Sequence, residues 1–177
     1  MAPKDGSFRV VASREVFRGR VFRVVNKDLS LSNGRRATWN VIEHPGACSI
    51  VARFEDGDVL LLRQLRPATG ETLWEIPAGT LEKGESPLDT AKREIVEETG
   101  YRARRWKKLR EFYTVPGFCN EYMHVFLATD LSPATAERDA DEVIRAVRVP
   151  FARALRMIDR GEIRDAKTIV GLLALRE

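Results

Sequence analysis

The segment from Ser86 to Gly100 constrains the fold more than any other stretch, because it carries both the start and the stop signals of one helix. Ser86 is a typical N-cap residue, and Pro87 suits the first helical position, where its missing N–H costs nothing. Gly100 is the residue type that most often follows the end of a helix. The sequence therefore predicts a helix over residues 87–99.

Apolar and acidic side chains divide the predicted helix between two faces. The apolar stripe, at helical spacing, consists of Leu88, Ala91, Ile95 and Thr99. At about 100° per residue, Glu94, Glu97 and Glu98 fall on the opposite face. Taken alone, three such acids are usually a solvated surface, where screening cuts the repulsion of each pair to roughly a few tenths of a kcal/mol.

Strand patterns precede the helix. Residues 8–12, 21–25 and 28–31 alternate in the strand manner, and Asn33-Gly34 is a strong hairpin signal before a returning run at 37–42. These runs predict a small antiparallel sheet over residues 1–43. Apolar runs at 49–54 and 59–65 predict a second, fully buried hairpin. Trp74–Ile76 predicts a short strand, and residues 78–85 a Gly-punctuated loop.

Strands at 102–115, 122–128 and 143–149 are predicted after the helix, followed by amphipathic helices around 151–158 and 169–173. This order of elements indicates an α+β fold or a sandwich with a mixed sheet. We expect an N-terminal β-sheet region over residues 1–43 and a second domain over residues 44–177.

The composition is that of an ordinary globular protein, with 44% apolar and 32% charged residues. The formal charge of +4 is compatible with an anionic substrate and does not require one. Cys48 and Cys119 lie far apart and suggest two reduced thiols. The sequence has no apolar run close to the ~20 residues that span a membrane, and its N-terminus does not resemble a signal peptide. We therefore expect a cytoplasmic protein that does not bind membranes.

The surroundings of the acidic helix add a spacing pattern. The residues, in order, are Gly79, Glu85, Arg93, Glu94, Ile95, Glu97, Glu98 and Gly100, which fit G-x₅-E-x₇-R-E-U-x-E-E-x-G-U, where U is a bulky apolar residue. This pattern resembles the Nudix box, departing only at the last position, where Tyr101 stands in place of the commoner aliphatic residue. The resemblance implies a Nudix-type α/β/α sandwich with a mixed sheet, and a pyrophosphohydrolase acting on phosphorus-containing acid anhydrides.

The resemblance also implies roles for these residues. It assigns Glu94, Glu98 and Glu97 as metal ligands, with the carbonyl of Ala78 pointing into the site because Gly79 permits a close turn. Carboxylate oxygens on a rigid helix suit Mg²⁺, with Mn²⁺ as a possible substitute. Glu85 and Arg93 are expected to pair and to hold the loop on the helix; an ordinary surface ion pair is the alternative.

The substrate depends on residues outside the box. Pro116, sixteen residues past Gly100, resembles the downstream proline of ADP-ribose pyrophosphatases, although a strand-ending turn of Pro116 and Gly117 would look the same. Arg63 and Arg66 are candidates for binding the diphosphate or the ribose, or are exposed strand residues. The resemblance implies hydrolysis of ADP-ribose, a nucleoside diphosphate sugar, to AMP and ribose 5-phosphate, by a homodimer whose N-terminal sheets contribute to both sites.

Other assignments stay open at this point. Glu142 is the first candidate for the general base and Asp141 the second, because relatives keep an acidic loop there. The same pattern is shared by GDP-mannose pyrophosphatases; RNA 5′-end hydrolysis and a non-catalytic ligand sensor are weaker alternatives. The basic run from Arg102 to Arg110, with Trp106 inside it, is interpreted as a solvated strand face, so we expect no nucleic-acid partner.

Overall fold

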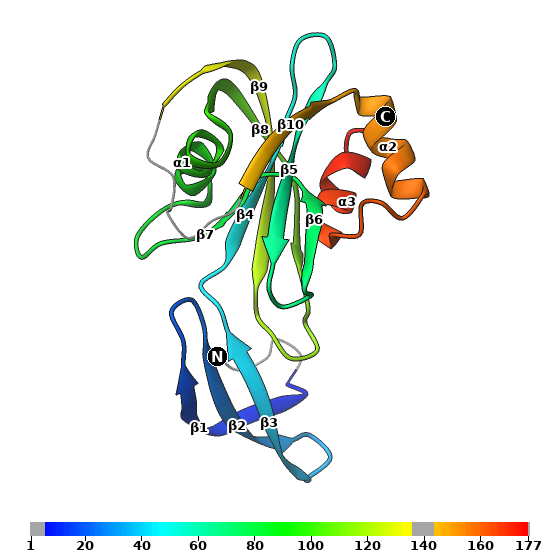
Figure 1. Cartoon of the computed structure of the whole chain (residues 1–177). Helices are drawn as coiled ribbons and strands as arrows, with labels where there is room; N and C mark the ends of the chain where they lie inside the picture. The colour runs from blue at the N-terminus through cyan, green and yellow to red at the C-terminus, as the bar shows by residue number, and fades with distance from the viewer. Residues whose placement is uncertain (1–5, 136–143, 177) are drawn as a thin grey trace. The chain divides into compact units, whose positions relative to one another are not determined.

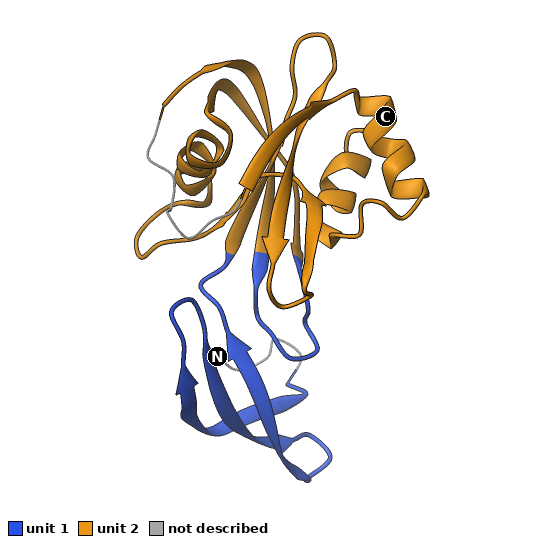
Figure 2. Ribbon diagram, in the orientation of Figure 1, with its two compact units in different colours: residues 1–46, 113–122 blue, residues 47–112, 123–177 orange. Residues whose placement is uncertain are grey.

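The computed structural model describes residues 6–135 and 144–176, and Figure 1 shows the arrangement of their helices and strands. In chain order these are β1 (Phe8–Arg18), β2 (Arg23–Leu31), β3 (Arg36–Glu43), β4 (Ala47–Ala52), β5 (Val59–Arg66), β6 (Glu71–Glu75), β7 (Ala78–Thr80), α1 (Pro87–Thr99), β8 (Tyr101–Tyr113), β9 (Tyr122–Pro133), β10 (Ile144–Val149), α2 (Phe151–Asp159) and α3 (Ala166–Leu173). The chain forms two compact units: residues 1–46 with 113–122, and residues 47–112 with 123–177 (Figure 2).

The first unit contains an antiparallel sheet of order β1-β2-β3. The expected turn after β2 is present, because Gly34 adopts a φ of 78° and donates its N–H to the carbonyl of Leu31. The runs predicted at 21–25 and 28–31 are in fact parts of one strand, since the antiparallel ladder with β3 continues through Asn26 and Lys27. Residues 113–122 join this unit through hydrogen bonds of Ile42 with Phe118 and Asn120.

The second unit contains two sheets, of orders β10-β5-β6 and β7-β4-β9-β8. β4 pairs in parallel with β9 and antiparallel with β7, so the sheet is mixed as expected. The prediction of a loop from residue 78 was wrong at its start. Ala78–Thr80 forms the short strand β7, whose backbone pairs with Ala47–Ser49 of β4.

Strand β4 is buried along its whole length and separates two apolar cores. Cys48, Ile50 and Ala52 pack in the core that contains Ala91 and Ile95 of α1. The second core contains Ala47 and Val51 together with Ala154 and Met157 of α2 and Leu172 of α3. Figure 1 accordingly shows α1 on one side of the sheets and α2 and α3 on the other, which confirms the α/β/α sandwich.

Helix α1 has the bounds that the sequence predicts. The Ser86 hydroxyl accepts a hydrogen bond from the N–H of Asp89 at 3.2 Å, and Gly100 ends the helix with a φ of 72°. Helices α2 and α3 lie where the sequence predicts two amphipathic helices. Gly161, which lies between them, has a left-handed φ of 71°. In the part of the chain that the structure describes, no helix is long and apolar enough to cross a membrane.

Strand β8 differs from the expected pattern of faces. Trp106 does not share the exposed face of the basic side chains, because it packs on the α1 core and stacks edge-on against Phe126 at 6.4 Å. The arginine and lysine side chains around it are exposed. Trp106 is therefore a packing residue and not an aromatic within a basic binding surface.

Candidate active site

Strand β7 and helix α1 approach each other closely at two acidic residues. The N–H of Ala78 donates a hydrogen bond to Glu98 Oε2 at 2.9 Å. A Cβ atom added to Gly79 would lie 1.9 Å from Glu94 Oε1, so any other residue would displace the carboxylate from its present position. Glycine thus permits the observed position of the Glu94 side chain, and no positive φ is needed at this residue.

Helical spacing alone suggested that Glu98 lies on a solvated face, but the structure shows this side chain to be buried. Its relative exposure is only 2%, because the side chain is covered where α1 packs against β7. A buried carboxylate is stable only with hydrogen bonds or a cation, and the Ala78 N–H supplies one such bond. The structure therefore places the N–H of Ala78 at the acidic site.

Arg93 links the remaining acids. Its Nε and Nη2 atoms donate to the two oxygens of Glu85 at 3.2 Å each, which confirms the predicted pair. Its Nη1 atom donates to Glu94 Oε1 at 2.8 Å and to Glu97 Oε2 at 2.9 Å. The hydrogen bonds from Arg93 hold the pKa of Glu85 below its ordinary value, and Glu85 raises the pKa of Arg93. Arg93 is therefore a fixed cation among three carboxylates.

The donor set at this site fits a hard divalent cation. Glu94, Glu97 and Glu98 supply carboxylate oxygens from one rigid helix, and the missing side chain of Gly79 makes the space that Glu94 occupies. Within residues 6–135 and 144–176, no three acidic, histidine or cysteine side chains are already gathered as a complete ligand set. Glu94 and Glu97 contact Arg93 instead, so a cation bound by both acids would replace the Nη1 contact.

The two arginines of β5 have well-defined partners. Arg66 donates from Nε and Nη2 to Glu75 at 2.8 and 2.7 Å, a bidentate pair. Glu75 raises the pKa of Arg66, and the charge of Glu98 contributes in the same direction. Arg63 instead lies over the ring of Trp74, 4.8 Å from its centroid. Arg66 is therefore within electrostatic reach of the acidic site.

The other predicted site residues lie elsewhere in the chain. Pro116 and Gly117 belong to the first unit, in a turn closed by hydrogen bonds from Phe118 and Cys119 to the Val115 carbonyl. Asp141 and Glu142, the candidates for the general base, lie outside the residues that the structure describes.

Cys48 is not a nucleophile. Burial raises the pKa of its thiol to about 12, so the thiolate is absent near neutral pH.

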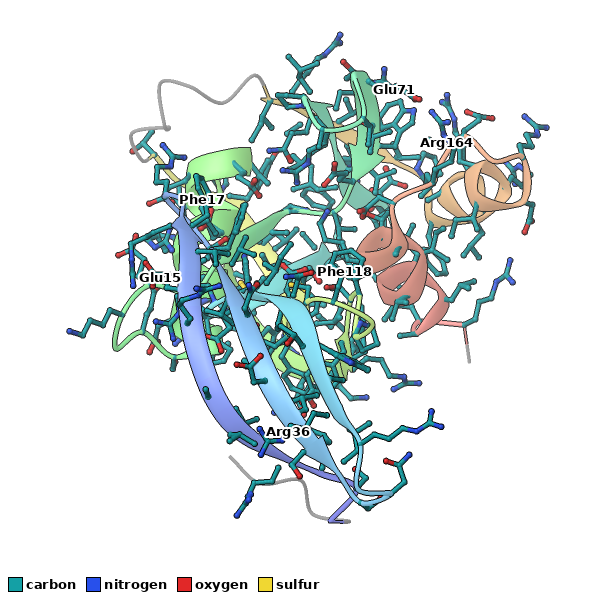
Figure 3. All side chains as sticks on the ribbon, turned by 90° about the horizontal axis from the view of Figure 1, so that it is seen from below. Glu15, Phe17, Arg36, Glu71, Phe118 and Arg164 are labelled. Atoms are coloured by element: carbon teal, nitrogen blue, oxygen red, sulfur yellow. The ribbon has the colours of Figure 1, made fainter. Side chains whose placement is uncertain are left out.

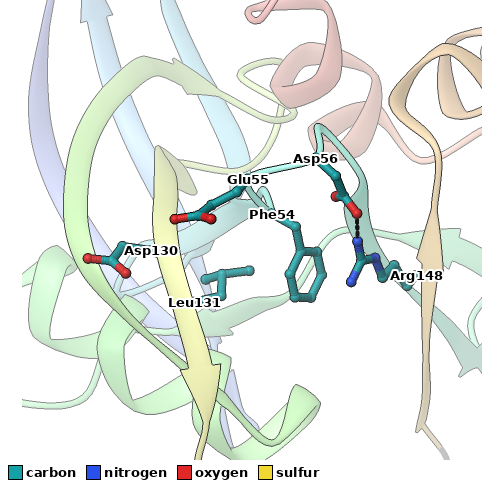
Figure 4. A pocket seen from close by; sticks show the side chains of 6 residues that line it. All are labelled: Phe54, Glu55, Asp56, Asp130, Leu131 and Arg148. Atoms are coloured by element: carbon teal, nitrogen blue, oxygen red, sulfur yellow. Dashed lines mark hydrogen bonds and ion pairs between the residues drawn. The ribbon is translucent and has the colours of Figure 1, made fainter.

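A hollow in the second unit is separate from the acids of α1. It is lined by Phe54, Glu55, Asp56, Asp130, Leu131 and Arg148 (Figure 4). It contains none of the predicted site residues.

Sequence reasoning missed a buried ionic cluster next to the site. Glu75, at 1% exposure, receives hydrogen bonds from Arg66 and from Lys167 of α3. Burial alone would raise the pKa of Glu75, but these two cations outweigh it and hold the pKa below its ordinary value. Periodicity could not reveal this cluster, because 92 residues separate Glu75 from Lys167.

Comparison with known proteins identifies the family. The family model described as NUDIX domain matches residues 43–170 of the chain, which include β7, α1 and all the acids discussed above. The chain belongs to the NUDIX family.

The relatives that match most of the chain are described by more than one function. An ADP-ribose pyrophosphatase from Bacillus subtilis (strain 168) is 39% identical, over 95% of this chain and 92% of its own length. A methanol dehydrogenase activator from Bacillus methanolicus is 34% identical with the same coverage. A GDP-mannose pyrophosphatase from Cronobacter sakazakii (strain ATCC BAA-894) is 33% identical, over 91% and 87%. Among solved structures, one described as the crystal structure of ADP compounds hydrolase is similar with a TM-score of 0.84 and 27% identity, over 96% of this chain and 92% of that chain.

The cluster at Glu75 gives a prediction about stability and pH. A carboxylate whose folded pKa is depressed stabilises the fold above its unfolded pKa, and the contribution is lost as the pH falls through the folded pKa. We expect Glu75→Gln to lower the free energy of unfolding by about 3–5 kcal/mol at pH 7, since two cations lose their buried partner. The difference from the unsubstituted protein should narrow below about pH 4, in urea titrations across pH.

Glu71→Gln is the matched control, because Glu71 lies on the same strand and pairs with Arg164 in an exposed ion pair (Figure 3). We expect it to cost under about 1 kcal/mol at any pH. Equal stabilities of the Glu75→Gln variant and the unsubstituted protein at pH 7 would contradict the role of the cluster.

Proposed function

We propose that this protein hydrolyses the diphosphate bond of ADP-ribose to AMP and ribose 5-phosphate with Mg²⁺. The observation that carries the proposal is the fit of the Glu94 carboxylate into the space left by Gly79, beside Glu98 on the Ala78 N–H. This arrangement gathers hard oxygen donors on one helix, as a Mg²⁺ site requires. The ADP-ribose pyrophosphatase from Bacillus subtilis, at 39% identity over most of both chains, supports the choice of substrate.

Several residues of this chain have defined tasks in the proposed reaction. Glu94, Glu97 and Glu98 would hold the cation, which when bound neutralises the charge that develops on the diphosphate and activates a water. Arg93 keeps Glu85 bound to α1 and orients the neighbouring acids. Arg66, held bidentately by Glu75 and with its side chain 39% exposed, would bind a phosphate oxygen. Arg63, Pro116 and Gly117 are proposed to contact the sugar or the diphosphate, and Glu142 or Asp141 to act as the general base.

GDP-mannose is the second candidate substrate. The GDP-mannose pyrophosphatase from Cronobacter sakazakii is 33% identical over most of both chains, which favours this alternative over other nucleotide sugars. The two substrates share the diphosphate, so the acidic site of α1 would serve both in the same way. Selection between adenine and guanine depends on residues outside that site.

A substrate panel tests the proposal. Purified protein is assayed with ADP-ribose, GDP-mannose, NADH and capped RNA, each with Mg²⁺, with Mn²⁺ and with chelator, and the products are separated by anion exchange. We expect ADP-ribose to give the highest kcat/KM, with AMP and ribose 5-phosphate as products and no turnover in chelator. Faster turnover of GDP-mannose would overturn the substrate, whereas turnover in chelator would overturn the metal site.

Replacing Glu98 by glutamine tests the assignment of the metal ligands. The glutamine oxygen can still accept from Ala78, so we expect little loss of fold but a fall in turnover larger than the roughly 10–100-fold that loss of a partner outside the ligand shell costs. The control is Glu162→Gln, an exposed acid after α2, for which we expect unchanged kcat. Activity retained by the Glu98→Gln variant, with its circular dichroism spectrum unchanged, would remove Glu98 from the metal site.

We further propose that the protein is a homodimer joined through its N-terminal sheet. Val11, Val16 and Phe17 of β1 and Trp39 of β3 are each more than half exposed, and Figure 3 shows Phe17 on the ribbon of β1. Several large apolar side chains exposed on one small sheet are typical of a surface that a second copy covers.

We also propose a reducing compartment, the cytoplasm, because neither Cys48 nor Cys119 forms a disulfide in the described residues.

The dimer is tested by placing a charge in this surface. We expect Phe17→Glu to convert a dimer into a monomer of 20.1 kDa in sedimentation equilibrium, because a buried unpaired carboxylate disfavours association. Leu173→Glu on α3 is the control and should leave the mass unchanged, since Leu173 lies in the other unit. A monomeric unsubstituted protein at micromolar concentration would contradict the proposal.

A further inference from the structure

The first turn of α3 is bonded to the segment that leads into β7. Thr168, which is fully buried, accepts a hydrogen bond at its Oγ1 from the N–H of Ile76 at 2.8 Å. The same hydroxyl donates to Asp165 Oδ2 at 2.6 Å, and Asp165 also accepts from the Thr168 N–H at 2.9 Å. Asp165 is the N-cap of α3, so the cap fixes the direction of the hydroxyl proton and turns a lone pair toward Ile76.

The bonded segment reaches the acidic site within three residues. Ile76 is followed by Pro77, whose ring fixes φ and whose carbonyl accepts from the N–H of Ile50 at 2.8 Å. Ala78 comes next and donates to Glu98, and Gly79 then lies against Glu94. Because the proline removes one rotation, a displacement of the Ile76 N–H is carried into the backbone that contacts both carboxylates.

Two further contacts of α3 fix the same segment. Lys167 joins Glu75, the residue before Ile76, to Asp165 of the cap. One turn later, a Cβ added to Gly171 would lie 2.9 Å from Ile76 Cδ1, so the backbone of α3 lies directly against this side chain. Buried hydrogen bonds of this kind specify one arrangement, because leaving any member without a partner is costly.

From these contacts we infer that Thr168 is a positioning residue of the acidic site: its hydroxyl sets the Ile76–Ala78 backbone, and thereby the carboxylates of Glu98 and Glu94 that receive the divalent cation. The inference rests on the proposed function only in requiring that these acids bind a divalent cation. It does not depend on the identity of the substrate. Among the described residues, the side-chain hydrogen bonds of Thr168 are with Ile76 and Asp165 and not with the acids of α1.

A pair of substitutions separates the hydroxyl from the size of the side chain. Thr168→Val keeps the shape and removes the acceptor for Ile76, whereas Thr168→Ser keeps the hydroxyl. Affinity for Mn²⁺ alone is measured by electron paramagnetic resonance, without substrate. We expect Thr168→Val to weaken Mn²⁺ binding about tenfold and to lower kcat with little change in KM, while Thr168→Ser stays within about threefold of the unsubstituted protein.

Met157→Ala controls for general destabilisation, because Met157 is buried in the same core and has no hydrogen bond to the Ile76–Ala78 segment. It should lower the melting temperature and leave the Mn²⁺ affinity unchanged. Unchanged Mn²⁺ affinity in Thr168→Val, or an equal loss in Met157→Ala, would overturn the inference. Absence of ADP-ribose turnover in an unsubstituted protein that binds Mn²⁺ would overturn only the substrate.

A measurement on the unsubstituted protein covers the case in which Thr168→Val does not fold. Coupling between two sites is reciprocal, so a cation bound at the acids must stabilise the contact at Thr168. We expect Mg²⁺ to slow amide hydrogen exchange in peptides covering residues 74–80 and 165–171, with no change in residues 151–158 of α2. Unchanged exchange in the first two peptides, at a Mg²⁺ concentration that saturates binding, would overturn the inference.

Discussion

The close approach of β7 to α1 at Gly79 is the constraint on which the site depends. The Glu94 carboxylate occupies the position that a side chain on Gly79 would fill, and the neighbouring N–H of Ala78 holds the carboxylate of Glu98. The Glu94 carboxylate can lie in this position because residue 79 lacks a Cβ atom. The mixed sheet, the cap of α1 and the fully buried β4 all serve to bring these two short segments together.

Charge balance is the second requirement of such a site. Glu85, Glu94 and Glu97 are all hydrogen-bonded to Arg93, which offsets the repulsion that three neighbouring carboxylates would otherwise have. The guanidinium is suited to this task because its planar fork can contact several carboxylates at once and it stays charged at any pH where the protein is folded. A site that binds a divalent cation needs its acids ionised, and the hydrogen bonds from Arg93 hold the pKa of Glu85 below its ordinary value.

Local signals in the sequence determined some features and not others. The bounds of α1 followed from Ser86, Pro87 and Gly100, because capping depends on residues within one turn. The burial of Glu98 did not follow, since helical spacing cannot show that a strand beginning 20 residues upstream of Glu98 covers that part of the acidic face. The strand β7 was missed for the same reason: three residues carry no periodicity, and only pairing with β4 defines them. The contacts of Thr168 and Lys167 join segments 92 residues apart, so no local pattern predicts them.

The ionic cluster around Glu75 is better explained by the side chains and backbone that it positions than by a net gain in the free energy of unfolding. Removing the charges of Glu75 and Lys167 from water is costly, and apolar side chains of similar size often stabilise a core equally well. Here both cations also have a second relation to the site, because the charge of Glu98 contributes to raising the pKa of Arg66, while Lys167 joins the cap of α3 to β6. Apolar substitutes would fill the volume but would not orient a guanidinium, nor fix the backbone that leads to Ala78. The polar cluster thus joins α3 to the segment whose Ala78 contacts Glu98 of α1.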